Sequence, residues 1–230
     1  MVRIPSLREF VLQCYDAICP ASYWVRPASR SGKYHPNLAR GAGGLIRHVK
    51  FGCFWADRIS RTRGNGKSDK DPESWGPHHD VAVAALILHD VMKDGNPLLD
   101  QGRGIIRAAD GSLADKVNGP WYSEISGCHG VDMANAIVEN VLAGAPTREQ
   151  FLVIMGIAAH MGVWTRPANY QPANLPDPEA RDVAFLVSTA DYCAAQKFES
   201  SVEAIMNKVP LPVVEQQLGS ADQNPASRAA

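Results

Sequence analysis

Apolar residues recur at helical spacing along much of the chain. The repeat is clear over residues 6–18, where one face carries Leu7, Phe10 and Tyr15. The same spacing, together with capping signals such as Thr147 three residues before Gln150, indicates helices at several further places. The further predicted helices cover residues 43–60, 79–92, 124–143, 147–161, 177–198 and 199–208. The pattern is typical of an all-α fold.

One short segment departs from the helical pattern. Asp110-Gly111 separates two short runs, which predicts a small β-hairpin near residues 104–116. Residues 20–42 are rich in Pro, Ser and Gly, and the end of the chain has no apolar periodicity. We therefore expect an N-terminal helix with a lid-like loop over 1–40, a helical domain over 41–214 and a disordered tail over 215–230.

The composition disfavours several classes of protein. The 230 residues are 45% apolar and 20% charged, which suits one buried core rather than a disordered chain. Lys and Arg total 23 and Asp and Glu total 24, so a protein that coats nucleic acid or an anionic membrane is disfavoured, while local nucleic-acid binding stays open. The longest uncharged apolar stretch, residues 151–164, is too short to span a membrane.

The start of the chain and its cysteines bear on where the protein works. Arg8 and Glu9 stand where a secretory signal would need its apolar run, so we expect no signal peptide. The five cysteines form no Cys-x-x-Cys pair, which fits reduced thiols better than a disulfide scaffold. We expect a cytoplasmic protein.

Polar side chains occupy core-facing positions on five of the predicted helices. These six groups are His48, His89, Asp90, His129, His160 and Asp191. A single histidine on an apolar face is usually a packed residue, but burying an unpaired carboxylate costs several kcal/mol. Two carboxylates among four histidines are most simply explained by a cation between them. Imidazole and carboxylate ligands without thiolate suit Zn, Fe, Mn, Ni or Co.

The ordered set of these residues resembles the HD-domain superfamily of metal-dependent phosphohydrolases. Residues 43–48 (GGLIRH) are similar to its first-histidine helix, residues 84–93 (AALILHDVMK) to its His-Asp helix, and residues 188–191 (STAD) to its closing aspartate helix. Val91-Met92 replaces the more usual Ile-Gly before the lysine. The resemblance covers about residues 40–200 and implies an HD-domain-like helical bundle.

The resemblance also implies how metal ions would be held. By resemblance, the ligands are His48, His89 and Asp191 for one ion, and His129 and His160, which match the binuclear branch of the family, for a second. Asp90 is the candidate bridge because a carboxylate has two oxygens, and two ions about 3.5–4 Å apart clamp a phosphoryl group and activate a water. If His129 and His160 are not ligands, a single metal remains, as in the mononuclear nucleotidase branch.

Four further residues are candidates for contact with substrate. Lys93 falls one turn after His89, where its ammonium could neutralise a phosphate oxygen, so Asp90 and Lys93 are the expected catalytic residues. Lys33 and His35 stand in the Gly- and Ser-containing loop, and Trp164 could stack on a base; a plain linker and ordinary rim packing remain the alternatives. Arg47 adjoins His48 but points about 100° away on a helix, so we interpret it as a surface residue.

The expected function is hydrolysis of phosphate esters by metal-activated hydroxide. The substrate would be a small phosphorylated molecule, a nucleotide or a linear or cyclic oligonucleotide, and the enzyme a phosphodiesterase or nucleotidase with divalent transition metal, two ions in the binuclear case. One alternative is a di-iron HD-domain oxygenase acting on a small polyol or phosphonate. Another is a catalytically silent HD-fold binding module. No membrane partner is expected, and the sequence does not indicate an oligomeric state.

Overall fold

The computed structural model describes most of the first two hundred residues. The described residues are 2–29, 35–63, 76, 78–93, 106–107, 113–114 and 129–196. The chain divides into two units, residues 1–197 and 198–230, and every described residue lies in the first. Lys33, the helix predicted over 199–208 and the tail predicted over 215–230 lie outside the described residues, and the domain boundaries expected at 40 and 214 stay predictions.

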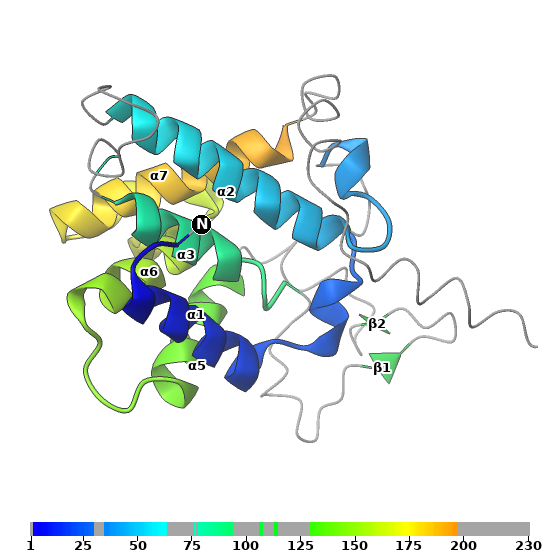
Figure 1. The fold of residues 1–230 in the computed structure, drawn as a ribbon, viewed down its shortest axis with the longest axis horizontal. Coiled ribbons are helices and arrows are strands. Elements are labelled where there is room, and N and C mark those ends of the chain that lie inside the picture. Colours follow the sequence, from blue (N-terminus) through cyan, green and yellow to red (C-terminus); the bar gives the residue numbers. More distant parts are fainter. Residues whose placement is uncertain are drawn as a thin grey trace, which may run out of the picture. The chain divides into compact units, whose positions relative to one another are not determined.

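The described part of the chain is predominantly helical, which confirms the predicted fold class (Figure 1). Its α-helices are α1 (Pro5–Ile18), α2 (Gly44–Arg63), α3 (His79–Leu88), α5 (His129–Asn140), α6 (Arg148–Ala159) and α7 (Pro178–Ala195). Short 3-10 helices connect them: η1 (Ala21–Trp24), η2 (Asn37–Ala39), η5 (Gly162–Trp164), η6 (Ala168–Tyr170) and η7 (Pro172–Asn174).

Two very short strands lie in the range where the sequence predicts a hairpin. They are β1 (Ile106–Arg107) and β2 (Leu113–Ala114), and they pair antiparallel with Ile106 opposite Ala114. The residues between them lie outside the described part of the chain.

Local signals in the sequence determine where α6 and α7 begin. The Thr147 side chain accepts a hydrogen bond from the Gln150 N–H at 3.3 Å, and the Gln150 side chain accepts one from the Thr147 N–H at 2.9 Å. The predicted capping box is therefore confirmed. Asp177 caps α7 by accepting from the Ala180 N–H at 2.9 Å, and Pro178 at the first helical position lacks the N–H that would otherwise stay unpaired.

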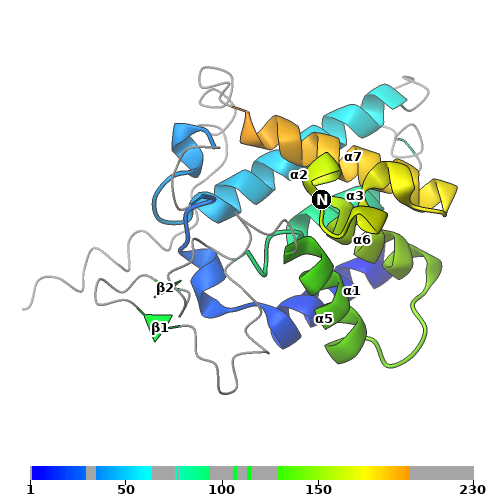
Figure 2. The same cartoon turned by 180° about the vertical axis from the view of Figure 1, so that it is seen from behind.

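Helix α3 lies at the centre of the bundle. It packs against α1, α2, α6 and α7, and its residues are buried except for the half-buried Ile87 (Figure 2). A helix that is apolar on all sides belongs in a core rather than on a surface. Gly156 of α6 makes the close approach possible, because a Cβ there would lie 3.1 Å from the Ala85 side chain and 3.2 Å from that of Val183. The end of α3 therefore delivers the following residues into the middle of the fold.

Among the residues that the structure describes, none of the helices is both long enough and apolar enough to cross a bilayer.

Candidate metal centre

The six predicted metal ligands come together at one place in the core. His48 lies within α2, His129 begins α5 and Asp191 lies near the end of α7. The other three follow the ends of helices: His89 and Asp90 come just after α3, and His160 just after α6. The prediction that α3 reaches residue 92 is wrong, since the helix ends at Leu88 and the chain continues in turns through Lys93.

His89 and His160 are aimed by the same local device. The Nδ1 of each ring lies beside the carbonyl oxygen three residues earlier, at 2.6 Å from Leu86 O and 2.7 Å from Ile157 O. A carbonyl only accepts, so each Nδ1 carries the hydrogen and donates it. This hydrogen bond fixes the tautomer and turns Nε2 towards the centre, which is how metal-binding histidines are commonly oriented.

A glycine allows His129 to approach His160. The Nε2 atoms of the two rings are 2.8 Å apart. Gly130, directly after His129, has no room for a side chain, because a Cβ would lie 2.6 Å from His160 Nδ1 and 2.5 Å from Ile157 O. The start of α5 can therefore lie directly against the end of α6.

Asp90 lies at the middle of the cluster. Its side chain is 1% exposed, and each of its oxygens faces nitrogen atoms. Oδ1 lies 3.1 Å from His129 Nε2 and 3.7 Å from His160 Nε2. Oδ2 lies 2.7 Å from Lys93 Nζ, 3.3 Å from His89 Nε2 and 3.5 Å from His48 Nε2. One carboxylate thus contacts both halves of the histidine set.

Asp191 closes the other side of the cluster. Its Oδ1 lies 2.9 Å from His48 Nε2 and 3.4 Å from His89 Nε2. The Asp191 side chain is 16% exposed, whereas the other five groups are 2% exposed or less. Asp191 is therefore the member of the cluster nearest to solvent.

The charges of the two carboxylates dominate the electrostatics. Burial works to raise the pKa of Asp90 and of Asp191, but neighbouring cationic and hydrogen-bonding groups, His89 among them, hold both pKa values well below the usual range. Burial works to lower the pKa of His89, but the two aspartates outweigh it and raise that pKa to about 10. Both carboxylates are therefore charged, and His89 balances part of that charge with a proton when no ion does.

The other pair of histidines is kept neutral. Burial, reinforced by the nearby His129 and His89, lowers the pKa of His160 to about 3. Burial also lowers the pKa of His129, despite the neighbouring Asp90. Neutral imidazoles offer the lone pairs that a metal ion needs.

The donor set fits a metal ion. Two groups have ligand atoms that all lie within 4.8 Å of one another: His48, His89 and Asp191 form one, and His89, Asp90 and His160 form the other. His89 Nε2 is buried between the two carboxylates, 3.3 Å from Asp90 and 3.4 Å from Asp191, so a cation could replace the proton that this nitrogen shares with them. The buried His and Asp groups could therefore hold a cation, with imidazole and carboxylate as its ligands.

The predicted substrate-binding residues take different positions. Lys93 is 8% exposed and its ammonium contacts Asp90, so it reaches the centre itself rather than only the mouth. His35 is 7% exposed, and its ring packs edge-on against His48 with centroids 4.6 Å apart. Trp164 is 60% exposed, and its ring is stacked on that of Tyr192, the residue after Asp191.

Some residues that support the centre are not apparent from the sequence. The hydroxyl groups of Tyr15 and Tyr23 both donate to the carbonyl oxygen of Ile87, at 2.9 Å and 3.2 Å, two residues before His89. Gly130 could have been suspected from its place beside His129. The two tyrosines carry no such signal, because their partner is a backbone atom far along the chain.

Comparisons with known proteins leave the family of the chain open. No protein-family model matches it, and neither a curated protein nor a solved structure shows significant similarity. The geometry of the centre and the motifs in the sequence are therefore what indicate the function of this chain.

Proposed function

We propose that this chain is a metal-dependent phosphohydrolase of the HD-domain type. The observation that carries the proposal is the position of Asp90, whose two oxygens face His129 and His160 on one side and His48 and His89 on the other. A carboxylate placed between two sets of imidazoles suits a bridge between two cations better than an isolated salt bridge. The order of these residues along the chain also agrees with the HD motif.

In this proposal the six groups hold two divalent transition metal ions. The ligands of the first ion are His48, His89, Asp90 and Asp191, and those of the second are Asp90, His129 and His160. When bound, such ions would lower the pKa of a water enough to supply hydroxide near neutral pH and would neutralise phosphoryl oxygens. Iron, manganese, zinc, nickel and cobalt all suit these ligands.

The remaining residues of the site would act on the substrate. Lys93 holds Asp90 through one N–H, and its other N–H groups can donate to a phosphoryl oxygen, because an ammonium has three. The exposed rings of Trp164 and Tyr192 stack on each other and offer a face for a nucleobase, and Tyr192 directly follows the most accessible ligand, Asp191, in the chain. These features favour a nucleotide or oligonucleotide as the substrate.

The direct test combines metal analysis with a screen of substrates. Purified protein would be analysed for bound transition metals and assayed for phosphate release from mononucleotides, a deoxynucleoside triphosphate, and linear and cyclic dinucleotides. Asp90→Ala should lose both the bound metal and the hydrolysis, because it removes the central carboxylate. Asp182→Ala, which changes an exposed aspartate of α7, should retain both.

Two results would contradict the proposal. One is full activity and metal content in Asp90→Ala. The other is a protein that binds iron and consumes dioxygen with a small polyol or phosphonate but hydrolyses no phosphate ester, which would favour the oxygenase alternative.

A further inference from the structure

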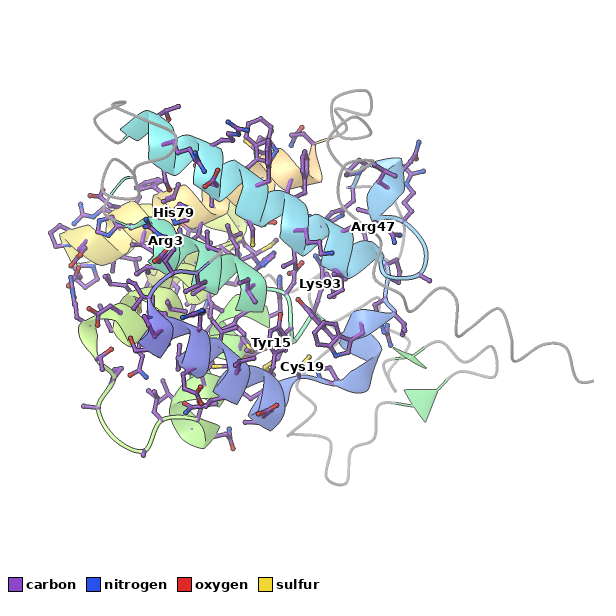
Figure 3. The ribbon with its side chains drawn as sticks, in the orientation of Figure 1. Arg3, Tyr15, Cys19, Arg47, His79 and Lys93 are labelled. Carbon is purple, nitrogen blue, oxygen red and sulfur yellow. The ribbon has the colours of Figure 1, made fainter. Side chains whose placement is uncertain are left out.

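Arg47, at the start of α2, fastens the loop that precedes this helix. Its guanidinium donates through Nε to the carbonyl oxygen of Leu38, and through Nη2 to the carbonyl oxygens of Arg40 at 3.1 Å and Ala42 at 2.8 Å. Figure 3 shows Arg47 beside this loop, at the N-terminal end of α2. Arg47 is half-buried and two of these hydrogen bonds are exposed, so it lies at the surface as expected, but it also holds the loop.

The backbone around this loop is built to fit closely. The N–H of Ala28 donates to the carbonyl oxygen of Ala39 at 2.9 Å. Gly44 has no room for a side chain, since a Cβ there would collide with the same carbonyl group of Ala39. Gly43 has φ +67, a conformation that glycine adopts without strain. The loop therefore has one well-defined path into α2, and Arg47 is its side-chain anchor.

The same loop carries His35 to the metal centre. His35 is buried, and its ring stands nearly perpendicular to that of His48, at an interplanar angle of 87°. The Nδ1 atom of His35 is buried and has no hydrogen-bond partner among the described residues. A buried ring nitrogen without a partner is unfavourable unless a ligand binds there, so this atom is a candidate contact for the substrate.

We propose that Arg47 is a positioning residue of the centre, which holds the loop of residues 35–43 so that His35 presents Nδ1 to an oxygen of the bound substrate. An arginine suits this task because its planar guanidinium can donate to three carbonyls in one plane, which a lysine ammonium on a flexible stem cannot reproduce. The contribution of His35 to turnover rests on the proposed function. The fastening of the loop by Arg47 does not.

Chemical labelling of histidines tests the fastening without any assay of activity. Diethylpyrocarbonate acylates accessible neutral imidazoles, and mass spectrometry reports the rate at each histidine. His35 should be acylated slowly in the wild type. In Arg47→Lys its acylation rate should rise by about tenfold or more, because the loop opens locally. His160, in the core, should stay protected in both proteins. Arg58→Lys is the matched control, because Arg58 lies on the same helix with its guanidinium over the ring of Phe54.

The protected His160 separates local opening from unfolding. If Arg47→Lys does not fold, every histidine reacts together, and Arg47→Gln, which keeps an amide donor, takes its place in the same comparison. Selective labelling of His35 in either variant supports the proposal. If His35 stays as protected as in the wild type in a folded Arg47 variant, or if Arg58→Lys exposes it equally, the proposal is overturned.

A double-mutant cycle then tests the link to turnover. Arg47→Lys should lower kcat/KM by about tenfold to a hundredfold, because a displaced contact residue loses its aim at the substrate, and should leave the metal content unchanged. In a His35→Ala background the same change should have little further effect, since the group that Arg47 positions is already gone. Full additivity of the two effects would overturn the link. A protein without any hydrolase activity would contradict the proposed function, while the labelling result would still decide the role of Arg47.

Discussion

At the scale of single residues, the balance of charge around Asp90 explains why six polar groups can share the core. Asp90 and Asp191 stay charged because cationic and hydrogen-bonding neighbours hold their pKa values low. Lys93 contributes one positive charge and a protonated His89 a second. A divalent cation could take over the role of the His89 proton, because metal binding and ligand deprotonation are coupled. The two positive charges therefore offset the two carboxylates without an ion, and the buried groups could hold a cation in place of the His89 proton.

Variants of His129 and His160 distinguish a centre with two metal ions from a centre with one. Each change to Ala should reduce the bound metal from about two ions per chain to about one and cost most of the turnover. The fold should survive with a loss of roughly 1–2 kcal/mol, because Asp90 loses one partner. Elemental analysis of the wild type and both variants measures this. One ion in the wild type, unchanged in both variants, would instead indicate a mononuclear centre.

Gly130 offers a test that changes no ligand. Gly130→Ala should lower metal affinity by displacing His160, because the new Cβ would lie 2.6 Å from His160 Nδ1 and clash with Ile157 O. Gly144→Ala is the control, since a Cβ at Gly144 meets nothing within 4 Å. Isothermal titration with a divalent metal gives the affinity of each protein. Equal affinities would show that the close approach of α5 to α6 is not needed for binding.

At the scale of elements, apolar periodicity predicted the bounds of a helix well where one face of that helix is buried at regular helical spacing. Helix α1 is predicted over 6–18 and observed over Pro5–Ile18, and α7 is predicted over 177–198 and observed over Pro178–Ala195. The error at α3 has a local cause. Apolar residues return at Val91 and Met92 after His89 and Asp90, so spacing alone extends the helix. The hydrogen bond from His89 to Leu86 O and those from two phenols to Ile87 O instead occupy the carbonyls that another helical turn would use.

The two phenols at the end of α3 should act together. Ile87 O accepts from Tyr15 and Tyr23, so either Tyr→Phe change alone leaves it one partner and should cost about 0.5–1.5 kcal/mol. The double change leaves a partly buried carbonyl without these partners and should cost more than the sum. Urea unfolding measures the free energies, with the exposed Tyr192→Phe as control. Additive losses would mean that the phenols do not share one acceptor.

At the scale of the whole molecule, the sequence predicted which His and Asp residues cluster in the core better than it predicted the residues that hold them in place. Six ionisable residues at core-facing positions of five predicted helices are a strong signal, because burying them apart would be costly. The residues that hold the cluster in place carry no such signal in the sequence. Arg47, Tyr15 and Tyr23 act on backbone carbonyls, and which carbonyl a side chain reaches depends on how the helices pack.

A second buried polar network joins the beginning of the chain to the bundle, and its effect should depend on pH. Asp80 accepts from the N–H groups of Arg3 and Ile4 at 3.1 Å each and lies 2.8 Å from His79 Nδ1, whose Nε2 lies 3.0 Å from Asp57 (Figure 3). Burial works to raise the pKa of Asp80, but hydrogen bonds from His79 and Arg3 outweigh it and lower the pKa. The folded state therefore holds this proton less tightly than the unfolded state does.

The sign of the pH effect follows from that lowered pKa. The stability that Asp80 contributes is present above the unfolded pKa of about 4 and is lost as the pH falls through the folded pKa. Asp80→Asn should cost about 1–3 kcal/mol at pH 7, and its difference from the wild type should shrink below about pH 4. Denaturant unfolding across this range tests it, with the exposed Asp16→Asn as control. A difference that is constant with pH would contradict the assignment.

Bound metal should stabilise the whole domain without being required for folding. The centre joins residues of α2, α5 and α7 to the ends of α3 and α6. An ion that binds only the folded state therefore raises the free energy of unfolding of all five helices together. At a free concentration of a hundred times Kd the gain is about 2.7 kcal/mol, which for a domain of this size raises Tm by roughly 5–10 °C. With a chelator the protein should still melt cooperatively, because Lys93 and a protonated His89 offset the two carboxylates. Calorimetry with metal and with chelator measures the shift, which should vanish in Asp90→Ala and persist in Asp182→Ala. A wild type that melts at the same temperature in both conditions would mean that no ion binds at this centre.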